Sequence, residues 1–283
     1  MWPTWDEAAI ACCLALLIWA SARWGMARLV PQGYAEDGRL HRVRYAVAAA
    51  ALEFSVVSAL YGVWRLARQL PFTQEAGAVD RARAIDDLQH HLGLPSELAL
   101  QHFVVQWQWL AATVNAYYAI VHVPALITFL IWMWIRHRDR YRFWRNNLVL
   151  VTLGCLLIRF IRVAPPRFVP ELGFVNLADH LGLDIYGDPG RGVSDQYAAM
   201  PSIHVAWAAI VALGVFASTR SRWRWVIVLH LPITLVVVAA TGHHWWLDGV
   251  VALGLLWLAV LIQRALTPSS RSVQTREPRS ASR

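Results

Sequence analysis

The sequence predicts an all-α, polytopic membrane helical bundle, and three observations lead to this prediction. Of the 283 residues, 57% are apolar and only 16% are charged, whereas soluble domains carry about 25% charged residues. The apolar residues gather in runs of the length that spans a bilayer, about 20 residues. All 26 basic residues are arginine, and they cluster between these runs rather than along one groove, which argues against nucleic acid as a partner.

Seven apolar runs are predicted to cross the membrane. The first follows Asp6 and Glu7, so it lacks the basic flank of a signal peptide and is interpreted as a span. The fourth is free of charge until Arg159 and Arg162 near its end. In order, the predicted spans cover residues 8–24, 46–64, 117–135, 147–163, 203–219, 225–241 and 249–265.

Two long segments separate the spans on one side of the membrane. Residues 66–116 contain a charged, amphipathic stretch, followed by a predicted helix that starts at Pro95 and Ser96 and lies on the membrane. Residues 164–202 contain a proline-rich stretch and then a loop rich in Gly and Asp.

Arginine placement predicts the orientation. Eighteen arginines follow the odd-numbered spans and six lie in the opposite loops, so the first group is predicted to be cytoplasmic. The carboxyl terminus is then cytoplasmic and the amino terminus outside, in a multi-pass protein of the cell membrane. The sequence divides into an amino-terminal span and cytoplasmic loop (1–45), a catalytic membrane domain (46–265) and a disordered basic tail (266–283).

Candidate catalytic residues lie at the outer ends of two spans. His244 and Asp248 are four residues apart, so on a helix they share one face. A carboxylate there fixes the imidazole tautomer and leaves the other nitrogen as a nucleophile. His204 lies at the same predicted depth on another span, where Pro201 suits the first turn of a helix. The amino terminus of that helix favours a bound phosphate.

Arginines near the same depth are candidate phosphate ligands. Arg159, Arg162 and Arg167 surround the end of the fourth predicted span, and guanidinium groups bind phosphate oxygens in pairs. Ser202 and His243, which belong to the two histidine motifs, complete the candidate substrate-binding set.

Two other readings remain open at this point. His204, His243, His244 and Asp248 have the chemistry of metal ligands, although adjacent histidines on a helix point about 100° apart. A transporter without chemistry would use intramembrane charges to line a pathway. His122 and His230, each alone within a span, are predicted to be packed or hydrogen-bonded residues.

The two motifs resemble those of a known enzyme family. Pro201-Ser-Ile-His204, followed by His244-Trp-Trp-Leu-Asp248, is similar to the type 2 phosphatidic acid phosphatase superfamily. Within it, the surrounding residues and the stretch from Asn115 to His122 most resemble the inositol phosphorylceramide synthase branch. Val237 and Val238 stand where the common third motif has Ser-Arg, a departure that this branch shares.

The resemblance implies a fold and a mechanism. It implies a six-helix core with one extra amino-terminal transmembrane helix. It also implies that His244 attacks phosphorus to form a phosphohistidine, that Asp248 orients His244, and that His204 protonates the leaving oxygen. The substrate would be a lipid phosphate or a phospholipid head group at the outer leaflet. The acceptor would be water or a polyol such as inositol, and no metal or other cofactor is required.

Overall fold

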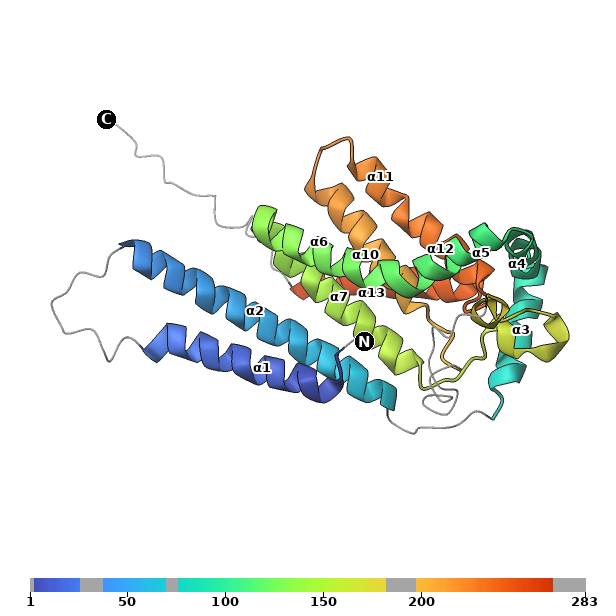
Figure 1. The fold of residues 1–283 in the computed structure, drawn as a ribbon, viewed down its shortest axis with the longest axis horizontal. Coiled ribbons are helices and arrows are strands. Elements are labelled where there is room, and N and C mark those ends of the chain that lie inside the picture. Colours follow the sequence, from blue (N-terminus) through green and yellow to red (C-terminus); the bar gives the residue numbers. More distant parts are fainter. Residues whose placement is uncertain (1–2, 26–37, 70–75, 182–196, 267–283) are drawn as a thin grey trace, which may run out of the picture. The chain divides into compact units, whose positions relative to one another are not determined.

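The structure, a computed structural model, describes residues 3–25, 38–69, 76–181 and 197–266 (Figure 1). Within these ranges the fold is an all-α membrane bundle, as predicted, and an isolated backbone bridge between Val163 and Ala198 is its one extended pairing. The chain divides into two compact units, Met1–Phe72 and Thr73–Arg283. The predicted tail lies, except for Leu266, outside the described residues.

The first unit contains α1 (Trp5–Ala20), its π-helical extension η1 (Ser21–Gly25) and α2 (Gly38–Gln69). Thr4 caps α1: its hydroxyl accepts from the Glu7 N–H, and the Glu7 carboxylate accepts from the Thr4 N–H. This reciprocal capping begins the helix at Trp5, three residues before the first predicted span.

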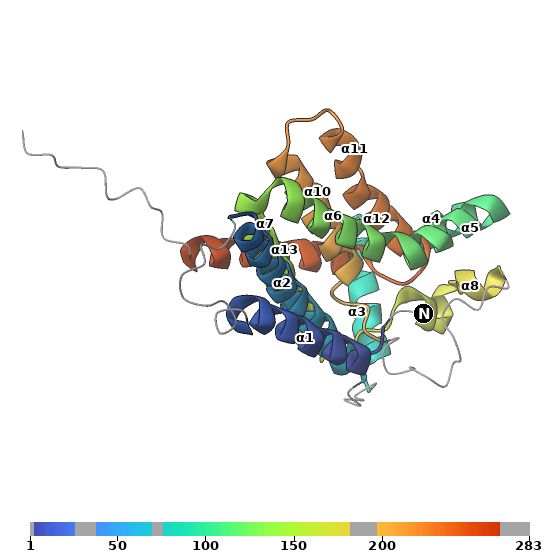
Figure 2. The same cartoon turned by 60° about the vertical axis from the view of Figure 1, so that its left-hand side comes forward.

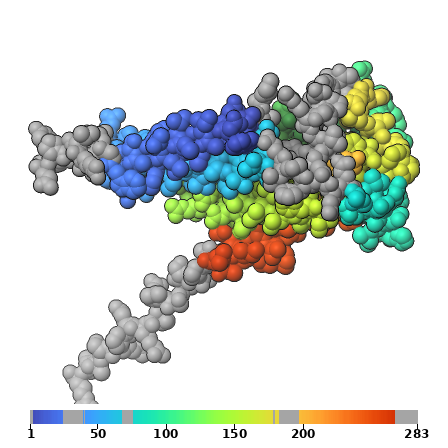
Figure 3. Space-filling view, turned by 90° about the horizontal axis from the view of Figure 1, so that it is seen from below, coloured from blue at the N-terminus to red at the C-terminus, as the bar shows by residue number. Residues whose placement is uncertain are grey.

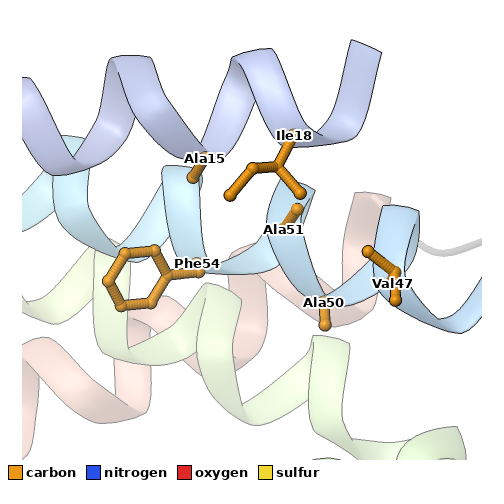
Figure 4. Close-up of a pocket in the computed structure, with 6 residues that line it drawn as sticks. All are labelled: Ala15, Ile18, Val47, Ala50, Ala51 and Phe54. Atoms are coloured by element: carbon orange, nitrogen blue, oxygen red, sulfur yellow. The ribbon is translucent and has the colours of Figure 1, made fainter. Parts of the chain in front are cut away.

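Small residues form the seam between α1 and α2. Ala8 and Ala15 on α1 are buried, as are Ala48 and Ser55 on α2. A Cβ on Gly62 would lie 3.5 Å from the Cβ of Ala8. In lipid, small side chains let helices approach closely. An apolar groove opens beside this seam (Figure 4), and it is lined by Ala15, Ile18, Val47, Ala50, Ala51 and Phe54.

The second unit begins with two helices that precede the next long apolar helix. The helix start predicted at Ser96 is confirmed, because its hydroxyl accepts from the Ala99 N–H at 3.2 Å. An ion pair between Arg83 and Glu171 joins the first of these helices to a later turn, and the two adjoin in Figure 3 (teal and yellow). The elements before the fifth predicted span are α3 (Ala78–His91), α4 (Glu97–Val105), α5 (Gln108–Ala116), η2 (Tyr117–Val121), α6 (His122–Arg136), α7 (Arg138–Ile158), η3 (Pro166–Phe168), η4 (Pro170–Leu172) and α8 (Leu177–His180).

The remaining helices complete the bundle around α10. They are α10 (Ile203–Ser218), α11 (Arg224–Val228), α12 (His230–Ala240) and α13 (Trp246–Leu266). α10 contacts α6, α7, α12 and α13, and it lies among them in Figures 1 and 2. A Cβ on Gly214 would lie 2.4 Å from Phe129 of α6, so only glycine permits this close approach. This close packing fixes the position of α10, and with it the first turn of the helix, in the bundle.

By length and composition, four of the seven predicted spans coincide with helices that could cross a membrane. Within the described residues these helices are Trp5–Trp24, His41–Ala67, Gln108–Arg136 and Trp246–Leu266. Ile203–Ser218 and Arg224–Ala240 are shorter apolar helices. The fourth predicted span falls in the second half of α7.

Three details differ from the sequence reading. The sixth predicted span is interrupted at Leu229, because Pro232 has no N–H to donate to the carbonyl four residues earlier. The third contains a π-helical turn, η2, which ends three residues before Pro124 of α6. The fourth helix ends at Ile158 rather than residue 163, because Val163 turns to an extended backbone that bonds with Tyr197 and Ala199.

Candidate active site

The first turn of α10 carries His204. Ser202 is the N-cap of α10, and its buried hydroxyl accepts from the Val205 N–H at 3.4 Å. Pro201 precedes this cap, so the prediction that it sits in the first turn is wrong by two positions. His204 is the second residue of the helix, where the backbone N–H groups have no helical partner.

A turn at Gly242, after α12, sets the positions of His243 and His244. Gly242 has a φ of +65°, a left-handed conformation that favours glycine. A Cβ there would also lie 3.2 Å from the Gln101 amide nitrogen. Because of this turn, the His244 N–H donates back to the Val238 carbonyl, and α13 begins only at Trp246. His243 and His244 therefore belong to a loop and not, as the spacing argument assumed, to the helix.

His244 and Asp248 nevertheless form the predicted pair. The Nδ1 atom of His244 lies 2.7 Å from the Ala199 carbonyl oxygen and 3.2 Å from Oδ2 of Asp248. Asp248 is fully buried, and its Oδ2 also accepts from the Trp245 N–H at 2.8 Å. Two acceptors at Nδ1 require a proton there, so Nε2 carries the lone pair.

His204 faces that lone pair. Nδ1 of His204 lies 3.3 Å from Nε2 of His244. Because Nε2 is the acceptor, the proton in this contact belongs to His204. The structure thus brings His244, from the loop before α13, within hydrogen-bonding distance of His204 from α10.

The three candidate arginines lie on the segment that runs from the end of α7 into η3. Arg159 is the C-cap of α7, and Arg162 is 4% exposed. The Arg167 N–H donates to the carbonyl oxygen of Gly242 at 3.2 Å, which ties this segment to the histidine loop. Arg81, which the sequence reading did not single out, donates from Nε to the Arg162 carbonyl oxygen at 2.6 Å.

His243 is a buried neutral imidazole beside the pair. Burial, and secondarily the positive charge of Arg167, lower the pKa of His243 well below its ordinary value. Its Nδ1 lies 3.1 Å from the Thr241 carbonyl oxygen. A neutral His243 acts through hydrogen bonding and packing rather than charge.

The sequence predicted no role for Tyr118 and predicted that His122 is a packed or hydrogen-bonded residue. The Tyr118 ring stacks on His243, with centroids 4.2 Å apart, and lies 4.6 Å from His204. The His122 ring lies 4.8 Å from His204. His230 is hydrogen-bonded as predicted, with Nδ1 2.6 Å from the Tyr117 hydroxyl. The sequence does contain a pattern that indicates this contact: polar residues recur at positions 115, 118 and 122 of an otherwise apolar run.

The start of α13 is held by side chains from α3 and α4. Oε1 of Glu97 accepts from the Trp246 N–H at 3.1 Å, and Oε1 of Gln89 accepts from the Leu247 N–H at 3.1 Å. Gln89 also donates to Glu97 at 2.8 Å. These bonds satisfy N–H groups that a helix start leaves open, and they fix the turn that carries Asp248.

Replacing Glu97 by glutamine is expected to stabilise the protein at neutral pH. Burial raises the pKa of the Glu97 carboxyl, although its hydrogen bonds partly oppose the rise. A carboxyl with a raised pKa gives its full stability below its unfolded value, about 4.3, and loses it as the pH rises through the folded value. Glu97→Gln keeps the acceptor and removes the charge, so the melting temperature should rise by about 2 °C or more at pH 7.5. The gain should vanish near pH 4.

The control is Glu171→Gln, which removes an exposed carboxylate of the same charge. We expect this variant to melt within error of wild type at both pH values, because exposed pairs contribute little. A Glu97→Gln variant that melts lower than wild type at pH 7.5 would show that the buried charge itself stabilises α13.

The described residues contain no preassembled metal-binding group. Over the described ranges, no three His, Cys, Asp or Glu side chains are placed to hold one ion. Measuring activity with and without EDTA tests whether the protein requires a metal.

Comparisons with known proteins place the chain in a family. The family model described as the PAP2 superfamily matches residues 83–262, which include α4 to α12 and all the candidate site residues. No curated protein and no solved structure gives a match. The matched region holds the Pro-Ser-x-His motif of α10 and the His-x-x-x-Asp pair before α13, as the resemblance in the sequence required. The chain belongs to the PAP2 superfamily.

Proposed function

We propose that this protein is an integral-membrane enzyme that transfers a phosphoryl group from a lipid phosphate or phospholipid head group through a phosphohistidine on His244. The observation that carries the proposal is the 3.3 Å approach of His204 Nδ1 to His244 Nε2. Superfamily membership supports phosphatase-type phosphoryl transfer. The apolar helices support a substrate that resides in the bilayer.

The first step makes the phosphoenzyme. The Nε2 lone pair of His244 attacks phosphorus, and the imidazolium of His204 gives its Nδ1 proton to the leaving oxygen. Asp248 and the Ala199 carbonyl hold the Nδ1 proton of His244, and they stabilise the positive charge that develops on the ring. Because Nδ1 of His204 and Nε2 of His244 lie 3.3 Å apart, the phosphoryl group must part the two rings when it enters.

The second step returns the site to its starting state. Water or an alcohol attacks phosphorus, the P–Nε2 bond breaks, and the acceptor proton passes to Nδ1 of His204. Arg159, Arg162 and Arg167 are proposed to bind the phosphate oxygens, together with Ser202 and the N–H groups at the start of α10. His243 is proposed to contact substrate.

The acceptor, the side of the membrane on which the site lies and the domain boundaries are part of the same proposal. The motifs most resemble the inositol phosphorylceramide synthase branch, so transfer to a polyol such as inositol is proposed beside hydrolysis. The arginine distribution supports a site on the extracytoplasmic side with a cytoplasmic carboxyl terminus. The catalytic domain boundaries, 46 and 265, are likewise proposals.

The test uses full-length enzyme in detergent with excess EDTA. Vesicles containing phosphatidic acid or phosphatidylinositol are supplied, with and without free inositol, and products are identified by mass spectrometry. We expect wild type to release phosphate or a phospho-alcohol at the same rate with and without EDTA. Activity lost with EDTA and restored by zinc would support the metal-dependent alternative. Lipid flux without any chemical product would support a transporter.

A further inference from the structure

Two buried polar side chains on the α5–η2–α6 helix have unused hydrogen-bonding capacity. Asn115 is fully buried, and His122 is 4% exposed. Within the part of the chain that the structure describes, neither amide atom of Asn115 and neither ring nitrogen of His122 has a hydrogen-bond partner. Unpaired polar groups inside a membrane protein are costly, so such positions mark places where a ligand or water supplies the missing bonds.

These side chains lie on the side of the helix that meets the catalytic histidines. Asn115, Tyr118 and His122 are three and four residues apart, which puts them on one side of a helix. The Tyr118 ring contacts both His243 and His204, and the His122 ring contacts His204 at 4.8 Å. His122 therefore borders the general acid directly, and Asn115 lies one helical turn from Tyr118.

The chemistry of this surface differs from that of the arginine segment. An amide and a neutral imidazole each offer both a donor and an acceptor, without net charge. That combination, next to the face of an aromatic ring, suits a hydroxyl group better than a phosphate. The cationic side chains at positions 159, 162 and 167 come from a different segment of the chain. The site thus has a charged part for phosphate and a neutral part for a hydroxyl.

We infer that Asn115 and His122, with the ring of Tyr118 between them, bind the acceptor hydroxyl that takes the phosphoryl group from His244. The inference rests on the proposed function and assigns residues to its second step. The acceptor oxygen forms its bond to phosphorus while the P–Nε2 bond breaks and the electron pair returns to Nε2. The hydroxyl proton passes to Nδ1 of His204, which lost its proton in the first step. The same chemistry serves water or an alcohol.

The experiment separates the two steps in full-length, detergent-solubilised enzyme. ³²P-labelled phosphatidic acid is the donor, and glycerol is added over a concentration series as the alcohol. Phosphoenzyme is trapped in alkali, where phosphohistidine survives, and the ratio of glycerol phosphate to free phosphate is measured. The variants are Asn115→Leu and His122→Phe, which keep volume and remove hydrogen bonding. His122→Gln serves as a rescue variant.

We expect phosphoenzyme formation to change by less than about 3-fold and its turnover by acceptor to fall about 10-fold, the effect of losing a hydrogen bond or two. His122→Gln should recover part of the loss. If glycerol transfer falls while hydrolysis stays at the wild-type rate, the acceptor at this surface is an alcohol. If both fall, the surface also holds water.

The matched control is Asn147→Leu. Asn147 is also fully buried, on α7; its amide nitrogen donates to the Phe143 carbonyl, and its Oδ1 has no partner among the described residues. It belongs to a different helix from Asn115 and His122, so this variant should keep the wild-type product ratio. Turnover of the phosphoenzyme at the wild-type rate in Asn115→Leu and His122→Phe would overturn the acceptor site and leave the proposed function intact. A wild-type enzyme that forms no phosphoenzyme would overturn both.

Discussion

His244→Ala is expected to abolish the phosphoenzyme and to lower turnover by at least about 10³-fold. The reason is structural: Nε2 of His244 is the nitrogen left with a lone pair once Asp248 and Ala199 hold the Nδ1 proton. The measurement is the amount of alkali-stable ³²P on the protein in a single turnover.

His243→Ala is the matched control for this loss. His243 is the adjacent histidine and is equally buried, but its ring stacks on Tyr118 and its Nδ1 lies 3.1 Å from the Thr241 carbonyl oxygen. The phosphoenzyme should therefore form in His243→Ala, at a reduced rate. Label that persists in His244→Ala would place the nucleophile elsewhere and contradict the mechanism.

The sequence was sufficient for the parts of the site that depend on local spacing. Apolar runs of bilayer length predicted the all-α fold, because a hydrogen-bonded helix is the simplest way to place a single run in lipid. The four-residue spacing of His244 and Asp248 predicted their contact. The contact holds although His244 precedes the helix, since the Asp248 carboxylate reaches back to the helix start and accepts from Trp245.

The parts that depend on tertiary contacts were beyond the sequence. The acceptor of the shortest His244 hydrogen bond is a backbone carbonyl, at Ala199, and any residue type could supply it. Glu97 reaches the start of α13 from a position 149 residues earlier in the chain. Tyr118 and His122 meet the histidines through the bundle packing of α6 against α10, which the spacing of one run does not reveal.

His204→Gln is expected to lose activity according to the leaving group. As general acid, His204 contributes about 10²–10⁴-fold where the leaving oxygen must be protonated. An alkyl phosphate such as phosphatidic acid needs that proton, whereas an aryl phosphate such as p-nitrophenyl phosphate leaves as a stable anion. Phosphoenzyme formation from phosphatidic acid should therefore fall by about 10²-fold or more, and formation from the aryl phosphate by about 10-fold or less.

The comparison must use the first turnover, because His204 also accepts the proton in the second step and its loss would slow multiple turnover on both donors. Asp248→Asn provides the contrast. It acts on the nucleophile through the 3.2 Å contact with Nδ1, so it should slow both donors by the same factor. Equal losses on both donors in His204→Gln would assign this histidine to binding instead of proton transfer. The 3.3 Å contact between the two rings would then be a resting arrangement that substrate removes.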